Sequence, residues 1–184
     1  MYKFNVNIDR LIIDFIQKHI HNPFLDRIIP FITSLGNLGL IWIIICIVLI
    51  ASKKYRKAGI IAIYSLIITT VLGEFLLKNL VARQRPFINI PNINLLINEP
   101  TSYSFPSGHT GSSFAAAFTF IKMIDNKILV IPLVLLACGI AFSRLYLIVH
   151  YPTDILGGII LGLISSLLAS KYFVFREKNK GLNL

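Results

Sequence analysis

The chain has 184 residues, of which 55% are hydrophobic and 14% are charged. Together with a positive mean hydropathy, this composition is too apolar for a soluble domain of this size and indicates an integral membrane protein. The net charge of +10 could suggest nucleic-acid binding, but the basic residues cluster between apolar segments, so we expect no nucleic-acid partner. We expect one all-α domain over residues 1–184, a bundle of five to six transmembrane helices with an N-terminal amphipathic segment.

The N-terminal segment, residues 1–22, mixes apolar and charged residues at helical spacing. Its apolar residues run from Val6 to Ile20 among Asp, Arg, Lys and His side chains, a pattern typical of a helix that lies at the membrane interface. Asp9, Asp14 and Lys18 interrupt the apolar core that a signal peptide requires, so no cleaved leader is expected.

The transmembrane bundle is expected over residues 24–175. Residues 24–51 form a first apolar stretch, with a kink at Gly36, Asn37 and Gly39. Further helices are predicted at 58–81, 107–123, 128–149 and 153–175, with an irregular loop at 83–105 and a cytoplasmic tail at 176–184.

Basic residues predict the orientation of this bundle. If the helices alternate in direction, the segments 52–57, 122–127 and the tail after 170 fall on one side, and they hold ten of the eighteen Lys and Arg residues. By the positive-inside rule that side is cytoplasmic. Three other polar segments, around residues 78–86, 106–109 and 143–154, then lie together on the extracytoplasmic face of the plasma (inner) membrane.

The first of these polar segments contains Lys78 and Arg85. Lys78 lies near the end of the second predicted helix, and Pro86 disfavours a helical conformation at Arg85, so the guanidinium can fold back toward the ammonium group. Two such cations suit a phosphate dianion. The alternative is that both side chains simply extend toward lipid headgroups.

The second polar segment is Pro106–Ser107–Gly108–His109. Proline and serine are start signals for the next helix, and a helix start presents unpaired N–H groups that attract anions. Gly108 allows a phosphoryl oxygen to approach the backbone closely. Ser107 could donate its hydroxyl, and His109 would lie beside the same anion. A simple capped helix with an interfacial histidine would show the same pattern.

The third polar segment combines Arg144 with His150 and Asp154. The two last residues bracket a helix start at Pro152 and can face each other. A carboxylate that binds the Nδ1–H of an imidazole leaves Nε2 available as a nucleophile or base. Arg144, at the outer end of the preceding helix, adds a third cation. A pair formed for stability alone is the alternative.

In order and spacing, these three segments resemble the signature motifs of the type 2 phosphatidic acid phosphatase (PAP2) superfamily. The motifs cover residues 78–154. The resemblance implies a metal-independent phosphatase that has no cofactor and works through a phosphohistidine. In that mechanism His150 attacks phosphorus, Asp154 orients it, and His109 protonates the leaving oxygen and then activates water. The residues implied to bind phosphate are Lys78, Arg85, Ser107, Gly108 and Arg144.

The substrate is expected to be a lipid phosphate or diphosphate whose tail stays in the bilayer. The run from His150 to Gly158 resembles bacterial family members that act on undecaprenyl diphosphate. Phosphatidylglycerol phosphate and phosphatidic acid are the alternatives, and a haloperoxidase or a non-catalytic lipid-phosphate binder or transporter are alternatives from other classes. Oligomeric state is not predicted.

Two further charged residues lie near the first motif. Glu74 precedes Lys78 by four residues, so we predict an ion pair that positions Lys78, with a pair that only lowers the cost of burying the two charges as the alternative. Arg83 has no place in the motif spacing and is expected to extend toward headgroups.

Overall fold

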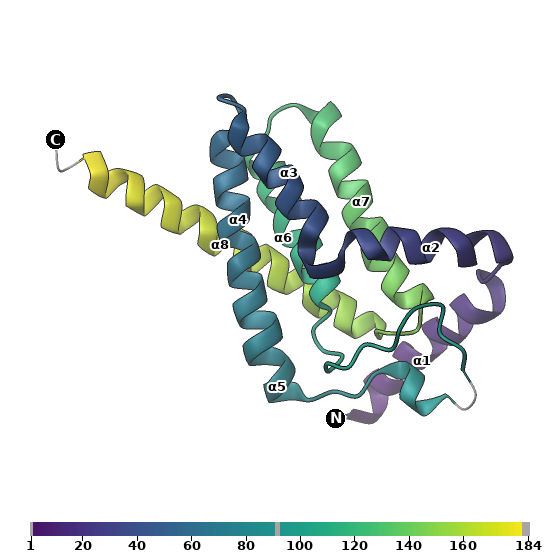
Figure 1. Cartoon of the computed structure of the whole chain (residues 1–184). Helices are drawn as coiled ribbons and strands as arrows, with labels where there is room; N and C mark the ends of the chain where they lie inside the picture. The colour runs from purple at the N-terminus through teal and green to yellow at the C-terminus, as the bar shows by residue number, and fades with distance from the viewer. Residues whose placement is uncertain (1, 91–92, 182–184) are drawn as a thin grey trace.

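The structure is a computed structural model that describes residues 2–90 and 93–181. All regular elements in these residues are helical, which confirms the all-α prediction (Figure 1). In chain order they are α1 (Tyr2–His19), α2 (Pro23–Leu35), the 3-10 turn η1 (Asn37–Gly39), α3 (Leu40–Ala51), α4 (Arg56–Thr70), the π-helical η2 (Val71–Leu77), α5 (Lys78–Val81), the 3-10 turn η3 (Pro86–Asn89), α6 (Gly108–Met123), α7 (Lys127–Tyr146) and α8 (Pro152–Gly181).

The predicted kink separates α2 from α3. Asn22 caps α2 by accepting from two backbone N–H groups, and Pro23 occupies the first helical position, as helix starts favour. Leu38 and Gly39 both adopt positive φ angles, 52° and 67°, so the backbone leaves the right-handed helix there. The two helices meet at 46°, and the bend places the polar side chain of Asn37 against His109 of α6 (Gly108–Met123).

The second predicted helix is one continuous helical stretch made of α4, η2 and α5. Its middle part is π-helical, and it ends at Ala82, whose φ of 46° is left-handed. π-helical turns inside α-helices are frequent at functional sites. Here the turn contains Glu74 and delivers Lys78 at the start of α5.

Helix α6 lies at the centre of the bundle and packs against α4, α7 and α8. Small residues allow this close packing, as is usual between membrane helices. For example, a methyl group added at Gly162 of α8 would lie 2.7 Å from the backbone nitrogen of Ala115. The indole of Trp42 on α3 donates to Ser113 on α6 over 3.0 Å, so α3 is also fixed to the central helix.

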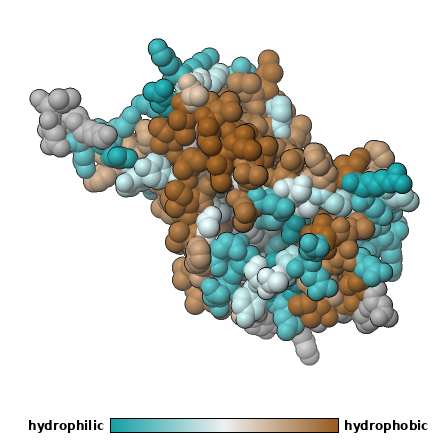
Figure 2. All heavy atoms as spheres, in the orientation of Figure 1, coloured by the Kyte–Doolittle hydropathy of each residue, from teal (hydrophilic) through white to brown (hydrophobic). Residues whose placement is uncertain are grey.

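The molecule has apolar helices suited to crossing a membrane. Three helical stretches are long and apolar enough, Arg56–Ile88, Lys127–Tyr146 and Pro152–Asn179, and the bent pair of α2 with η1 and α3 would be a fourth span. Helix α6, with 16 residues, is shorter than the roughly 20 residues of a full span. The number of five to six spans therefore stays a prediction. Figure 2 shows an apolar area across the middle of the molecule, with polar atoms above and below it.

Two helix ends differ from the prediction. Helix α7 ends at Tyr146, three residues before the predicted 149, because the chain turns there and Ile148 has a φ of 57°. Helix α8 continues to Gly181, so the predicted tail is helical up to that residue, and residues 182–184 lie outside the described part.

The basic connections lie at one end of the bundle. The turns between α3 and α4 and between α6 and α7 are at the top of Figure 1, whereas α5 and the first turn of α8 are at the opposite end. The polar motifs lie at this opposite end, since Lys78 is on α5 and Asp154 is in the first turn of α8.

The N-terminal helix α1 packs against α7 and α8. It buries Asp9, Ile13 and Ile16, which are spaced as one face of a helix, and the charged residues Arg10 and Asp14 are exposed. The amphipathic pattern predicted for 1–22 therefore includes a face directed at the bundle, and this face carries a buried carboxylate.

Candidate active site

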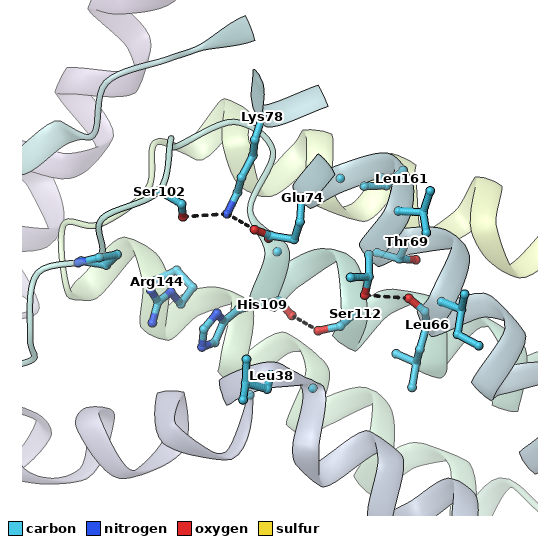
Figure 3. A pocket seen from close by; sticks show the side chains of 18 of the residues that line it. Leu38, Leu66, Thr69, Glu74, Lys78, Ser102, His109, Ser112, Arg144 and Leu161 are labelled. Atoms are coloured by element: carbon cyan, nitrogen blue, oxygen red, sulfur yellow. Dashed lines mark hydrogen bonds and ion pairs between the residues drawn. The ribbon is translucent and has the colours of Figure 1, made fainter. Parts of the chain in front are cut away.

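The three polar motifs, distant in sequence, line one cavity of about 590 Å³. Figure 3 shows Lys78, His109 and Arg144 converging on this cavity from three different helices. Six of the eight predicted site residues line it: Lys78, Arg85, Gly108, His109, Arg144 and His150. Ser107 and Asp154 are completely buried behind this lining.

Lys78 is held at the cavity by two oxygen atoms. Its ammonium lies 2.8 Å from Oε2 of Glu74, the predicted i,i+4 ion pair, and 3.0 Å from Oγ of Ser102 (Figure 3). The Lys78 side chain is 7% exposed and that of Glu74 is 38% exposed, so the lysine is the buried partner of the pair. Ser102 comes from the loop before α6 and had no signal in the sequence.

Arg85 is fixed by carbonyl groups. Its backbone is extended before Pro86, as predicted, and its guanidinium donates to the carbonyl oxygens of Ser102 at 2.7 Å and Val149 at 2.8 Å. Ser102 Oγ also accepts from Arg85, at 3.2 Å, so this one serine connects both cations of the first motif. These partners are neutral, and they orient the positive charge without cancelling it.

Arg144 is a deeply buried cation of the cavity. It is 3% exposed and donates to Oγ1 of Thr33 on α2 at 2.6 Å. Its Nε is buried and has no hydrogen-bond partner among the described residues. Buried polar groups in folded proteins are nearly always paired, and an unpaired guanidinium N–H at a cavity is a good receptor for an anion.

The N-terminus of α6 forms another part of the cavity. Ser107 is its cap, since its hydroxyl oxygen accepts from the backbone N–H of Thr110 at 3.4 Å. The hydroxyl thus serves the helix and does not line the cavity. Gly108 faces the Glu74 carboxylate so closely that any side chain there would overlap it. The first N–H groups of a helix have no intrahelical partner, so those of Gly108 and His109, which line the cavity, can receive an anion.

His109 is oriented by the kink between α2 and α3. Its Nε2 lies 3.0 Å from Oδ1 of Asn37. An amide oxygen only accepts, so in this arrangement Nε2 carries the proton. The sequence placed Asn37 in a kink and did not predict its contact with a site residue.

His150 presents Nε2 to the cations. Arg85 approaches this nitrogen at 3.2 Å, and because a guanidinium only donates, Nε2 is the acceptor and the ring proton is on Nδ1. Nδ1 faces Asp154 Oδ2 at 3.5 Å, which is long for a hydrogen bond and close enough for an electrostatic contact. Burial lowers the pKa of His150 to about 3 although Asp154 opposes the shift, so the ring is neutral at pH 7.

The prediction for Arg83 was wrong. Its guanidinium bridges two completely buried carboxylates, at 2.7 Å from Oδ2 of Asp9 and 2.6 Å from Oδ1 of Asp154. It does not extend toward headgroups, because the chain turns at Ala82 and directs it into the interior. The one sequence signal for this contact was Asp9 itself, an acidic residue on the apolar side of an amphipathic helix.

Among the described residues, no group of three or more His, Cys, Asp or Glu side chains is arranged to hold a metal ion. What the cavity offers is an anion site with two imidazoles, three cations and a helix N-terminus. Such a combination can bind a phosphate group and place a neutral imidazole next to it.

Thr33 provides a first test of this anion site. In Thr33→Val the Arg144 guanidinium loses its hydrogen bond to Thr33, so its direction is less well fixed and we expect inorganic phosphate to bind about tenfold more weakly, on the scale of one hydrogen bond to a charged group. Calorimetry or competition with vanadate would measure this. The matched control is Ser34→Ala, on the same helix turn, whose hydroxyl bonds a local carbonyl. Equal phosphate affinity in Thr33→Val and wild type would contradict this role.

Glu74 provides a second test. In Glu74→Gln the ammonium of Lys78 loses its charged partner, and we expect phosphate affinity to fall about threefold to tenfold because Lys78 is less well fixed. The control is Glu177→Gln, which removes the exposed pair with Lys57. An unchanged or increased affinity would show that Glu74 repels the anion or only lowers the cost of burial.

The chain is similar to known membrane proteins. A profile of the PAP2 superfamily matches residues 58–178, which contain all three motifs. Undecaprenyl-diphosphatase from Sulfolobus acidocaldarius is 34% identical over 138 residues, 75% of this chain and 66% of that protein. The chain thus spans just under two thirds of that relative's length.

Two solved structures are similar over nearly the whole chain. The crystal structure of Aquifex aeolicus LpxE has a TM-score of 0.76 and 28% sequence identity. The alignment covers 93% of this chain and 97% of the LpxE chain. The transmembrane PAP2 type phosphatidylglycerolphosphate phosphatase from Bacillus subtilis has a TM-score of 0.72 and 28% identity, with 94% and 86% covered. With the motif residues gathered at one cavity, these matches establish that the chain is a multi-pass membrane protein of the PAP2 superfamily.

Proposed function

We propose that this protein is a membrane lipid phosphatase that removes phosphate from a lipid phosphate or diphosphate through a phosphohistidine on His150. The observation that carries this proposal is the neutral imidazole of His150, whose Nε2 faces the cation-lined cavity while Nδ1 faces Asp154. A protein that only binds lipid phosphates has no need of a nucleophile in this position.

In the first half of the reaction, Nε2 of His150 attacks phosphorus in line with the leaving oxygen. A P–N bond forms and the P–O bond to the lipid breaks. The leaving oxygen takes a proton from His109, which must enter this step as the imidazolium and leaves it as the neutral ring. Asp154 stabilises the imidazolium that forms. Lys78, Arg85 and Arg144 neutralise the charge on the non-bridging oxygens, which is most of what phosphoryl transfer requires.

In the second half, water attacks the phosphohistidine. His109 takes a proton from that water, the P–N bond breaks, and inorganic phosphate leaves with His150 restored. The backbone of Gly108 would bind phosphate at the start of α6 and Ser107 would cap that helix. No step needs a metal ion, and we propose a metal-independent reaction.

The cavity also supports an amphiphilic substrate. Opposite its charged end it is lined by aliphatic side chains of η1, α3 and α4, among them Leu38, Ile43, Leu66 and Ile67. Leu38 is 97% exposed and Ile67 is 54% exposed, so this apolar side continues onto the outer, lipid-facing surface. A lipid can therefore keep its tail in the bilayer while its phosphate reaches His150.

We favour undecaprenyl diphosphate as the substrate, since the run after His150 resembles the bacterial proteins that use it and the relative from Sulfolobus acidocaldarius is named undecaprenyl-diphosphatase. Phosphatidylglycerol phosphate and phosphatidic acid are the alternatives, and the solved Bacillus structure favours the former. We place the site on the extracytoplasmic face because the basic connections lie at the other end of the bundle.

His150 and Asp154 test the chemistry. We expect His150→Ala to lose nearly all turnover, and Asp154→Asn to lose on the order of 10⁴ in kcat by analogy with the aspartate of serine triads. Phosphate release by purified protein measures both, with His19→Ala, an exposed histidine outside the cavity, as the control. Retained turnover in His150→Ala, or less than tenfold loss in Asp154→Asn, would refute the proposed roles.

The substrate and the metal requirement can be tested together. Purified protein in EDTA is given a panel of undecaprenyl diphosphate, undecaprenyl phosphate, phosphatidylglycerol phosphate and phosphatidic acid, and released phosphate is measured. We expect activity to persist in the chelator and to be highest with undecaprenyl diphosphate. Loss of activity that returns with added metal would overturn metal independence, and a different ranking would replace the proposed substrate.

A further inference from the structure

The N-terminal helix α1 carries a buried carboxylate that reaches the start of α8. Asp9 has no exposed surface. Its Oδ1 accepts from the backbone N–H of Thr153 at 3.0 Å and its Oδ2 from the Thr153 hydroxyl at 2.6 Å. Asp9 therefore caps α8 from another helix, where a negative charge is also favoured by the helix dipole.

Arg83 links this carboxylate to the one that orients His150. One terminal nitrogen of its guanidinium binds Asp9, and the other binds Asp154 at 2.6 Å and the Thr153 hydroxyl at 2.7 Å. The guanidinium also lies over the ring of Tyr151, with 3.9 Å between its central carbon and the ring centroid. The carboxylates bind the terminal nitrogens of the guanidinium and the tyrosine ring covers one of its faces. These contacts together hold the side chain in one orientation.

As a consequence, each carboxylate oxygen of Asp154 has its own set of partners. Arg83 occupies Oδ1. Oδ2 is left to the backbone N–H of Tyr151 at 2.8 Å, the hydroxyl of Ser104 and Nδ1 of His150. Because Arg83 prevents rotation of the carboxylate, Oδ2 stays directed at the imidazole.

We propose that Asp9 and Arg83 are positioning residues for His150, so that α1 is part of the catalytic apparatus. This inference rests on the proposed phosphatase function. It reaches beyond the part of the chain that matches the superfamily, since Asp9 lies before residue 58. Both residues act through Asp154 and neither lines the cavity.

A purely structural role would predict a different outcome. Two buried carboxylates need a cation, and a pair formed for that reason would affect folding without any specific effect on chemistry. The positioning role predicts instead that phosphate binding is kept, because Lys78, Arg85 and Arg144 do not contact Asp9 or Arg83 among the hydrogen bonds of the described residues, and that the chemical step is slowed.

The test uses Asp9→Asn and Arg83→Lys in the full-length protein. Lysine keeps the charge but lacks the planar fork that fixes the two carboxylates relative to each other, so we expect both variants to lose about tenfold to a hundredfold in kcat. The inhibition constant for inorganic phosphate, the KM and the melting temperature should stay close to wild type. Asp14→Asn and Arg10→Lys, two exposed residues of the same helix, are matched controls that should keep full activity.

The double variant separates coupled from independent effects. If the two residues act as one unit, Asp9→Asn with Arg83→Lys should be no slower than the slower single variant. Arg83→Lys alone decides the matter if Asp9→Asn does not fold. Wild-type kcat in Arg83→Lys, or a loss of kcat matched by an equal loss of phosphate affinity or of stability, would overturn the proposal. An inactive wild-type protein would instead refute the phosphatase function.

Discussion

The structure depends on burying positive charge without neutralising it. Arg85 and Arg144 are each 3% exposed, and their hydrogen-bond partners are mainly carbonyls and hydroxyls of Ser102, Val149 and Thr33. Neutral acceptors satisfy the donors and fix their direction while the charge stays available to an anion. A buried, uncompensated guanidinium is costly in a membrane protein, and an anion bound in the cavity would reduce this cost.

Arg83 shows the opposite solution two residues away from Arg85. Its charge is compensated by two carboxylates and it does not line the cavity. It therefore holds Asp9 and Asp154 in place and offers no free charge to an anion. Two arginines only two positions apart thus have different roles, and the difference lies in whether their partners are charged or neutral. The left-handed turn at Ala82 is what directs the chain so that both can reach inward.

Residues before position 58, outside the part that matches the superfamily, supply three contacts to the cavity and its supporting side chains. Asp9 contacts Arg83, Thr33 contacts Arg144, and Asn37 contacts His109. Each is a polar side chain in an amphipathic or apolar helix or at its kink. The bend between α2 and α3 is needed for this, since it places Asn37 against α6 while α2 lies along α7.

The sequence by itself determined the local features of this protein: the apolar helices, the kink at residues 36–39, the Glu74–Lys78 pair, the helix start at Ser107 and the facing of His150 and Asp154. These follow from spacing within one or two helical turns, which fixes which residues are neighbours. Tertiary structure decided the partners of Arg83, Arg144 and His109, which lie 74, 111 and 72 positions away. Such contacts depend on how helices pack and where the chain turns between them, and spacing along the chain carries no record of that geometry.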